Sequence, residues 1–348
     1  MSRLSQFASD NTAGICPQAW QALEEANVDS SPAYGEDEWT ARASDALRDL
    51  FETDCEVFFC FNGTAANSLS LAHLCRSFHG VIAHASAHIE NHECGGPEFF
   101  SHGSKLLLAQ GPDGKLRPQD VQEISTRRTD IHYPKPRVLS VTQSTELGTC
   151  YTRGELEALG ASAREHGLLM HMDGARFANA VAALSVRPRE LTWEAGVDVL
   201  CFGGTKNGLP LGEAVVFFDR ELAHEFDFRC KQAGQLASKM RYLAAPWVVS
   251  LESGGWLENA RHANLQTKKL GAALSKIPGF SLVREPEVNA VFLEVESALA
   301  ERLRRRGAVF HDFMGSGTRW MCSWSTTDED IEQMVQVAQQ EAGLDREV

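Results

Sequence analysis

The chain has 348 residues, 43% of them hydrophobic and 23% charged, proportions typical of a globular protein with one large and one small domain. Its net charge of −14 argues against nucleic acid or an anionic membrane as the main partner, but still allows a local basic pocket for one phosphate. No apolar run approaches the ~18 residues that span a bilayer, and residues 1–14 lack the apolar core of a signal peptide. Nine cysteines without a C-x-x-C pair indicate reduced thiols, so we expect a cytoplasmic protein.

Short apolar runs alternate with helical segments between about residues 55 and 220. Strands that are apolar on both faces and separated by helices indicate a mostly parallel sheet covered by helices on both sides. The last strand follows its predecessor too closely for a helical crossover, so we expect it to be antiparallel. The predicted strands are 55–61, 80–84, 137–143, 168–173, 197–204 and 213–219.

Helix signals and a change of pattern complete the outline of an α/β fold. Thr152 and Glu155 have the spacing of a helix-capping box, and Gly167 marks the end of that helix. From about residue 246 a long helical stretch runs to about 277, followed by strands and helices that suggest a small α+β domain. We therefore divide the chain into an N-terminal segment that contributes to the site, a large cofactor-binding domain and a small C-terminal domain, covering residues 1–30, 31–245 and 246–348.

One lysine stands directly behind a predicted buried strand, in "VLCFGGTKNG" (199–208). The two glycines before Lys206 let the backbone turn sharply and leave room for a bulky group. A lysine there loses hydration, which lowers its pKa and prepares the amine for Schiff-base chemistry. On this stretch alone, a surface lysine in an ordinary turn is the plainer interpretation.

Polar residues follow the other predicted strands at the sheet edge where α/β proteins bind ligands. A lysine for a Schiff base, a carboxylate for a pyridine nitrogen, a helix N-terminus for a phosphate and an imidazole that stacks on a ring are the parts of a pyridoxal phosphate site. Each has a plainer interpretation as a helix cap or a structural histidine, so the prediction depends on their conjunction. In chain order the residues are Gly63 and Thr64, His88, Ser144 and Thr145, Asp173 and Arg176, and Lys206.

Several motifs together resemble those of the low-specificity L-threonine aldolases, which have the aspartate-aminotransferase fold of pyridoxal phosphate enzymes (fold type I). The resemblance covers nearly the whole chain, and D-G-A-R and G-G-T-K-N are specific only in combination. The motifs are "FNGTAAN" (61–67), "AHIENHECGG" (87–96), "HMDGARFANA" (171–180) and "CFGGTKNGLPLGEAVVFF" (201–218).

The resemblance implies a role for each matching residue. Lys206 would form the Schiff base, Asp173 would face the pyridine nitrogen, and Arg176 would lie near the phenolic oxygen or the substrate carboxylate. Arg319 would bind the α-carboxylate through a bidentate guanidinium, with a hydrogen bond added by Ser9. The phosphate would be held by Gly63 and Thr64, with Lys231 reaching it from a neighbouring subunit, and Tyr34 would reach into the partner's site.

The implied reaction is retro-aldol cleavage of L-threonine, L-allo-threonine and related β-hydroxy-α-amino acids to glycine and an aldehyde. His88 would stack on the cofactor ring and is a candidate to assist proton transfer from the β-hydroxyl. The family also implies a homodimer with shared active sites, paired into a tetramer. An aldolase that prefers β-aryl serines, or a β-eliminating lyase, is the alternative within the same cofactor chemistry.

The chain departs from the family at one position. Many members carry a histidine after the strand that matches 137–143, in contact with the substrate hydroxyl, whereas this chain has Ser144, Thr145 and Glu146 there. His132, before the strand, is a candidate to compensate. The preference between threo and erythro substrates therefore stays open.

Two other classes of protein compete with this interpretation. His84, His88 and His92 recur every four residues and would form a metal site of a metallohydrolase if the segment were helical. The spacing is not the H-E-x-x-H of zinc proteases, and a metal leaves Lys206 and Asp173 unexplained, so we predict no metal. A non-enzymatic binding module is disfavoured because Asp173 and Lys206 occur together with Arg319.

Overall fold

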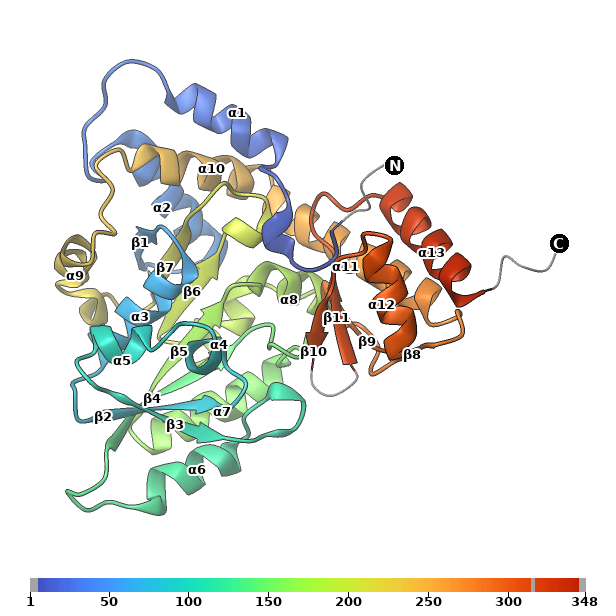
Figure 1. Cartoon of the computed structure of the whole chain (residues 1–348). Coiled ribbons are helices and arrows are strands. Elements are labelled where there is room, and N and C mark those ends of the chain that lie inside the picture. The colour runs from blue at the N-terminus through green and yellow to red at the C-terminus, as the bar shows by residue number, and fades with distance from the viewer. Residues whose placement is uncertain (1–5, 314–316, 344–348) are drawn as a thin grey trace.

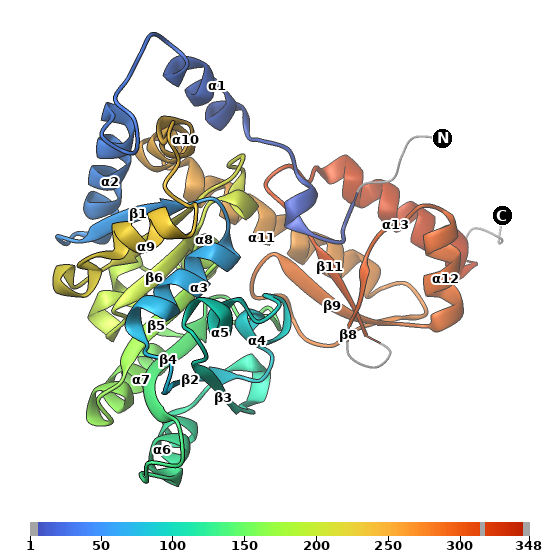
Figure 2. The same ribbon diagram turned by 60° about the vertical axis from the view of Figure 1, so that its left-hand side comes forward.

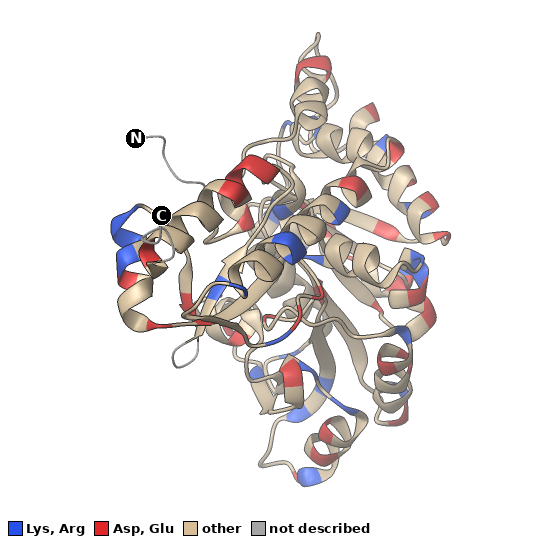
Figure 3. Cartoon of the chain, turned by 90° about the vertical axis from the view of Figure 1, so that its right-hand side faces the viewer, with Lys and Arg blue, Asp and Glu red and all other residues tan. Residues whose placement is uncertain are grey.

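The computed structural model describes residues 6–313 and 317–343. A seven-stranded sheet surrounded by helices forms the larger part, and a four-stranded sheet near the C-terminus forms the smaller part (Figure 1). On the face that Figure 3 presents, acidic and basic residues are interspersed over most of the helices. No helix in the described ranges is long and apolar enough to cross a membrane.

The large sheet has the strand order β1-β7-β6-β5-β4-β2-β3. β7 is antiparallel to both of its neighbours, and the pairs β6–β5, β5–β4, β4–β2 and β2–β3 are parallel, which confirms the mostly parallel sheet and its one reversed strand. The edge strand β3 was not predicted, because its apolar run is only three leucines long. The strands are β1 (Glu56–Cys60), β2 (His79–His84), β3 (Lys105–Ala109), β4 (Lys135–Thr142), β5 (Leu169–Gly174), β6 (Val199–Gly203) and β7 (Glu213–Phe217).

Helices cover both faces of this sheet, as predicted. Alternate side chains of β5 and β6 point to opposite faces, so that Met172 and Phe202 join one apolar core while Cys201 joins the other. The first core is closed by α1 (Pro17–Ala26), α2 (Glu38–Phe51), α6 (Pro118–Arg127), α7 (Arg153–Glu165), α8 (Phe177–Leu184), α10 (Arg241–Glu252) and α11 (Gly255–Leu274). The second is closed by α3 (Gly63–Leu74), α4 (His88–Asn91), α5 (Gly96–Phe100) and α9 (Phe226–Gln232).

The capping box predicted for α7 is present, with Thr152 accepting from the Glu155 amide and Glu155 accepting from the Thr152 amide. The helical stretch predicted to start near residue 246 is two helices, α10 and α11. They are separated at Gly254, whose φ of 76° lies in the left-handed region that interrupts a helix. Residue 246 itself lies inside α10, which packs against α1 and α2.

The small sheet is antiparallel throughout, with the order β10-β11-β9-β8. α12 ends in a basic run, and Arg306 directly after the helix pairs with Glu341 of α13 at 2.8 Å. The small domain also contains β8 (Phe280–Leu282), β9 (Ala290–Val295), β10 (His311–Phe313), β11 (Gly317–Met321), α12 (Ser297–Arg305) and α13 (Asp328–Ala342).

The N-terminal segment connects the two parts. The Phe7 amide donates to the carbonyl of Val309 at 3.1 Å, and the Phe7 carbonyl accepts from the Met321 amide at 2.8 Å, so this segment extends the small domain. The chain then forms the 3-10 turn η1 (Asp10–Thr12) and continues into α1, which packs on α10 of the large part (Figures 1 and 2). The turn η1 is thereby placed between the two sheets.

Candidate active site

The carboxyl ends of β4, β5 and β6 bring the predicted residues together. Thr142 pairs in register with Asp173, and Asp173 pairs with Cys201, so these strands end side by side. His88 follows β2, and one of its ring nitrogens lies within 4.8 Å of an Asp173 carboxylate oxygen. The polar residues that follow the predicted strands therefore lie close together in the structure, as expected.

Lys206 lies in the 3-10 turn η5 (Thr205–Asn207) directly after β6 and is half-buried. Its amine makes no hydrogen bond or ion pair with any residue that the structure describes. Burial lowers the pKa of Lys206 and repulsion by Arg176 lowers it further, against the attraction of Asp10 and Asp173. The amine thus has no partner among the described residues, and its lowered pKa favours the neutral, nucleophilic form.

The two glycines before Lys206 are required by packing within the protein, whereas the sequence suggested that they leave room for a bulky group. A Cβ on Gly203 would lie 2.4 Å from the carbonyl oxygen of Ala175, and a Cβ on Gly204 would lie 2.7 Å from the Trp247 ring. Both contacts are with the protein itself. The glycines therefore permit close packing of β6 against the loop after β5 and against α10.

Asp173 is buried at the end of β5 and held on both carboxylate oxygens. Oδ1 accepts the Ala175 amide at 3.0 Å, and Oδ2 accepts the Asn67 side-chain amide at 3.0 Å. The same Asn67 nitrogen donates to Glu93 Oε1 at 2.9 Å, and this oxygen is 2.8 Å from His88 Nδ1. Asn67 and Glu93, to which the sequence analysis gave no role in the cofactor site, link His88 to Asp173 in one buried network.

His88 begins α4 and presents a half-exposed ring. The ring stacks on His92, with 5.4 Å between centroids and 23° between planes. His88 Nδ1 is engaged by Glu93, whose pKa is raised by burial and lowered by the His88 hydrogen bond, with a net upward shift. One face of the ring and the second nitrogen are left for other contacts.

Arg176 and Asp10 form a buried ion pair between the large domain and the N-terminal segment. The Arg176 Nε is 2.7 Å from Asp10 Oδ2, and Nη2 is 2.9 Å from Oδ1. Burial would raise the pKa of Asp10, but Arg176 outweighs it and the net shift is downward. Asn289, before β9, also donates to Oδ2 at 3.0 Å. Neither Asp10 nor Asn289 was predicted.

Arg319 projects from β11 and, unlike Arg176, has no anionic partner among the described residues. Its Nε is buried and without a hydrogen bond. Burial lowers the pKa of Arg319, and repulsion by Arg176 lowers it further, because its positive charge is not fully compensated by a neighbouring anion. An anion bound beside the guanidinium would supply that compensation. Ser9, next to Asp10, is half-buried, and its hydroxyl caps η1 by accepting the Asn11 amide at 3.2 Å.

The predicted phosphate residues open α3. Asn62 caps this helix by accepting the Ala65 amide at 2.9 Å, and a Cβ on Gly63 would meet no atom within 4 Å other than those of its chain neighbours and its own helix backbone. The N-terminus of α3 with Thr64 is therefore open to an anion. Lys231 and Tyr34 are exposed and contact each other, with the Lys231 amine 4.3 Å from the Tyr34 ring centroid.

His132 is not brought into this cluster. It is exposed, and it lies in the loop before β4, whereas the cluster gathers where the parallel strands end. A residue that precedes a strand lies at the opposite edge of a parallel sheet from the residues that follow the strands.

The predicted histidine trio is not one helical face. His84 ends β2, and its ring nitrogens are engaged by Ser86 at 2.6 Å and by the carbonyl of Gly111 at 3.0 Å. Within the described ranges, His88, Glu93 and Asp173 have donor atoms within 4.8 Å of one another. The Asn67 amide already bridges the two carboxylates of that group.

The residues present fit pyridoxal phosphate, judged from polar atoms that the protein leaves unsatisfied. Buried side-chain atoms normally find hydrogen-bond partners, so a concentration of exceptions indicates a ligand. A phosphate, a ring nitrogen, an aldehyde and a substrate carboxylate are what this mixture of groups can bind. The unsatisfied atoms on elements around the cluster include Asn67 Oδ1, Ser68 Oγ, Ser144 Oγ, Glu146 Oε2, Thr205 Oγ1 and Arg319 Nε.

Comparison with known proteins agrees with this geometry. Residues 6–298 match the family model described as beta-eliminating lyase. Two proteins named low specificity L-threonine aldolase are 59% identical (Pseudomonas aeruginosa) and 57% identical (a Pseudomonas species), each over 94% of this chain and 95% of the relative. The solved structure of a Leishmania major threonine aldolase superposes with a TM-score of 0.91 at 28% identity, covering 97% of this chain and 99% of the other.

The chain belongs to the beta-eliminating lyase family and, within it, to the low specificity L-threonine aldolases. The resemblance drawn from the motifs is therefore confirmed. The predicted cofactor is confirmed too, because these are pyridoxal phosphate enzymes. The fold is also shared with more distant proteins, such as mouse CSAD, with a TM-score of 0.77 at 16% identity.

Proposed function

We propose that this chain cleaves L-threonine, L-allo-threonine and related β-hydroxy-α-amino acids to glycine and an aldehyde, using pyridoxal phosphate. The observation that carries the proposal is the unpaired Lys206 amine beside Asp173, in a chain 59% identical to a protein named low specificity L-threonine aldolase. An enzyme of this class is a carbon–carbon lyase.

Pyridoxal phosphate, when bound, supplies an aldehyde for an amine and a protonated ring that withdraws electrons from the amino acid's Cα. Lys206 offers the amine that holds this group. Asp173, kept oriented by Asn67 and Ala175, holds a proton on the ring nitrogen, because a buried carboxylate stabilises a positive charge beside it. The N-terminus of α3, with Gly63 and Thr64, binds the phosphate.

The two arginines of the site have different roles. Arg319 binds the α-carboxylate of the amino acid through its free guanidinium edge. Arg176, neutralised by Asp10, lies beside the cofactor and is not available as a second carboxylate clamp. Ser9 adds a polar group near the same carboxylate. His88 stacks on the ring, with its orientation set by Glu93.

The reaction is tested by adding the cofactor to the purified protein and offering L-threonine, L-allo-threonine, phenylserine and serine in separate assays. Acetaldehyde from the first two supports the proposal, whereas a dominant release of benzaldehyde assigns a β-aryl preference. Pyruvate and ammonia from serine without any aldehyde would assign a β-eliminating lyase. Lys206→Ala must abolish turnover, and Lys276→Ala, an exposed lysine after α11, serves as the matched control.

We also propose a homodimer with shared active sites, paired into a tetramer, in which Tyr34 and Lys231 face the partner's site. Both residues are exposed, and Phe228, which lines the same surface hollow as Lys231, is 72% exposed. Mixing the inactive variants Lys206→Ala and Lys231→Ala tests the sharing. If Lys231 serves the partner, a hybrid dimer regains one intact site and activity returns; if it serves its own chain, the mixture stays inactive.

We place the enzyme in the cytoplasm. Its nine cysteines are all unpaired, and eight of them are buried, an arrangement suited to a reducing compartment. Fractionation of the source cells with a periplasmic marker enzyme tests this location.

A further inference from the structure

Glu146 lies in the loop after β4 and contacts the candidate site. Its Oε1 accepts the backbone N–H of His88 at 2.7 Å and the Thr142 hydroxyl at 3.0 Å. Its Oε2 is buried and has no hydrogen-bond partner in the part of the chain that the structure describes. A buried carboxyl oxygen without a partner costs free energy. A bound ligand or a proton on the carboxyl would remove this cost at Oε2.

The charges around Glu146 favour exchange of a proton at neutral pH. Burial and the Asp173 carboxylate raise the pKa of Glu146, hydrogen bonds from its own backbone amide, from His88 and from Thr142 lower it, and the net result is a pKa of about 7. Arg176 and Tyr151 are the other titratable groups in electrostatic contact with it. A carboxyl that is present in both forms near pH 7 suits acid–base catalysis.

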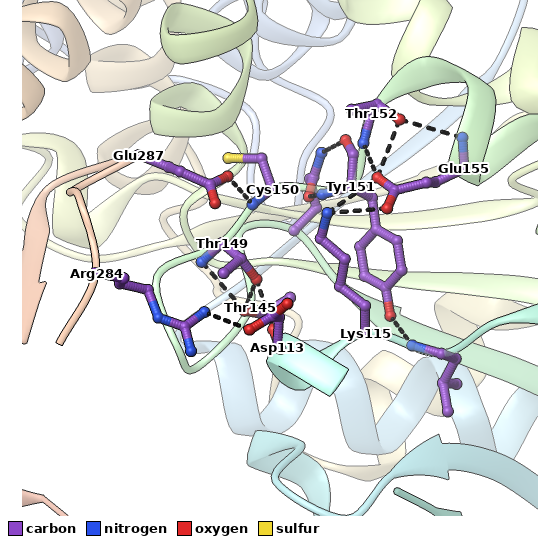
Figure 4. Close-up of polar contacts among 12 residues, drawn as sticks. Asp113, Lys115, Thr145, Thr149, Cys150, Tyr151, Thr152, Glu155, Arg284 and Glu287 are labelled. Carbon is purple, nitrogen blue, oxygen red and sulfur yellow. Dashed lines mark hydrogen bonds and ion pairs between the residues drawn. The ribbon is translucent and has the colours of Figure 1, made fainter. Parts of the chain in front are cut away.

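The loop that carries Glu146 is firmly held (Figure 4). The Thr145 and Thr149 hydroxyls are 2.6 Å apart, and the Thr149 hydroxyl donates to the Asp113 carbonyl at 2.7 Å. The Cys150 amide donates to Glu287 of the small domain at 2.8 Å. The loop is thus tied to both domains, and the Glu146 carboxyl is preorganised.

We propose that Glu146 is a second acid–base residue of this site and takes the β-hydroxyl proton of the substrate on its free Oε2. The inference rests on the proposed aldol cleavage. As the O–H bond breaks, its electron pair forms the carbonyl of the aldehyde and the Cα–Cβ bond breaks. The electron pair of that bond stays with Cα, which takes one proton from solvent to become glycine, while Glu146 releases its proton to solvent.

Glu146→Gln keeps the shape and one acceptor oxygen but cannot take a proton. We expect kcat for threonine to fall at least ~100-fold, and the loss of kcat below pH ~7 to disappear from the residual activity. Cofactor affinity and the exchange of glycine α-protons with D2O should stay within ~3-fold, because neither involves a hydroxyl. Glu90→Gln, an exposed neighbour on α4, is the control, and Glu146→Asp should recover part of the activity.

Infrared difference spectra of the cofactor-free protein give a readout independent of activity. Wild type minus Glu146→Gln should show one carboxyl that loses its proton near pH 7. Wild-type kcat in Glu146→Gln, an equal loss of glycine exchange, or a carboxyl that titrates near its ordinary value would overturn the inference. An unmutated enzyme that cleaves no hydroxy amino acid would instead overturn the proposed function.

Discussion

Asp10 and Arg176 form a two-pronged ion pair, at 2.7 and 2.9 Å, that ties the N-terminal segment to the loop after β5. Both residues belong to short motifs around the candidate site, "FASDN" and "DGAR". The pair neutralises Arg176, whereas Arg319 has no anionic partner among the described residues. The charge balance of the site therefore depends on a residue far from it in sequence.

Asp10→Ala should destabilise the protein by about 3–5 kcal/mol, because it leaves the Arg176 charge buried and unpaired. The pKa of Asp10 is lowered in the fold, so its stabilisation is present above its unfolded value of about 4 and lost as pH falls through the lower, folded value. Urea unfolding at pH 7 and in acid measures both effects. Asp227→Ala, an exposed change on α9, should cost less than about 1 kcal/mol; an equal loss in both variants would refute the role of the pair.

Arg319→Lys should lower kcat/KM for threonine about 10- to 100-fold, chiefly through a higher KM, because a lysine cannot make two parallel hydrogen bonds to a carboxylate. The cofactor spectrum should not change. Arg261→Lys, an exposed change on α11, provides the comparison in steady-state kinetics. Unaltered KM in Arg319→Lys would mean that another group binds the carboxylate.

Glu213→Gln should make the cofactor-free protein more stable in mild alkali. Glu213 is buried on β7, and burial raises its pKa to about 7, with attraction by Lys206 and the hydrogen bond from the Gly204 amide opposing this shift. Because the unfolded chain releases this proton near pH 4.5 while the folded chain keeps it up to about pH 7, stability falls as pH rises through this range, by at most about 3 kcal/mol. Melting temperatures at pH 5 and pH 8 test this: the advantage of Glu213→Gln should appear only at pH 8. A variant that is less stable at both pH values would show that the hydrogen bond to Gly204 outweighs the charge.

The strand-end rule explains why part of the site was predictable. Lys206, Asp173 and Arg176 follow buried strands whose apolar runs are easily recognised, and parallel strands place such residues at one edge. The motif resemblance added Arg319 from the small domain. The fold class followed from the same alternation of apolar runs and helices.

The residues that were missed depend on tertiary contacts. Asn67 lies in the middle of α3 and Glu93 follows α4, and only the packing of these helices beside β5 brings them to Asp173. Asp10 forms an ion pair with Arg176, which lies 166 positions away in the sequence. The sequence suggested that the glycines before Lys206 leave room for a ligand. Their packing partners, Ala175 and Trp247, are distant in sequence and become adjacent to them only in the fold.

The most direct test of the central claim is to reduce the cofactor-loaded protein with borohydride and to locate the modified residue by peptide mass spectrometry. This treatment makes a link between an amine and the cofactor permanent. The account predicts one phosphopyridoxyl group, on the peptide that contains Lys206, and none in Lys206→Ala. Attachment to another lysine, or no attachment in a protein that still cleaves threonine, would contradict it.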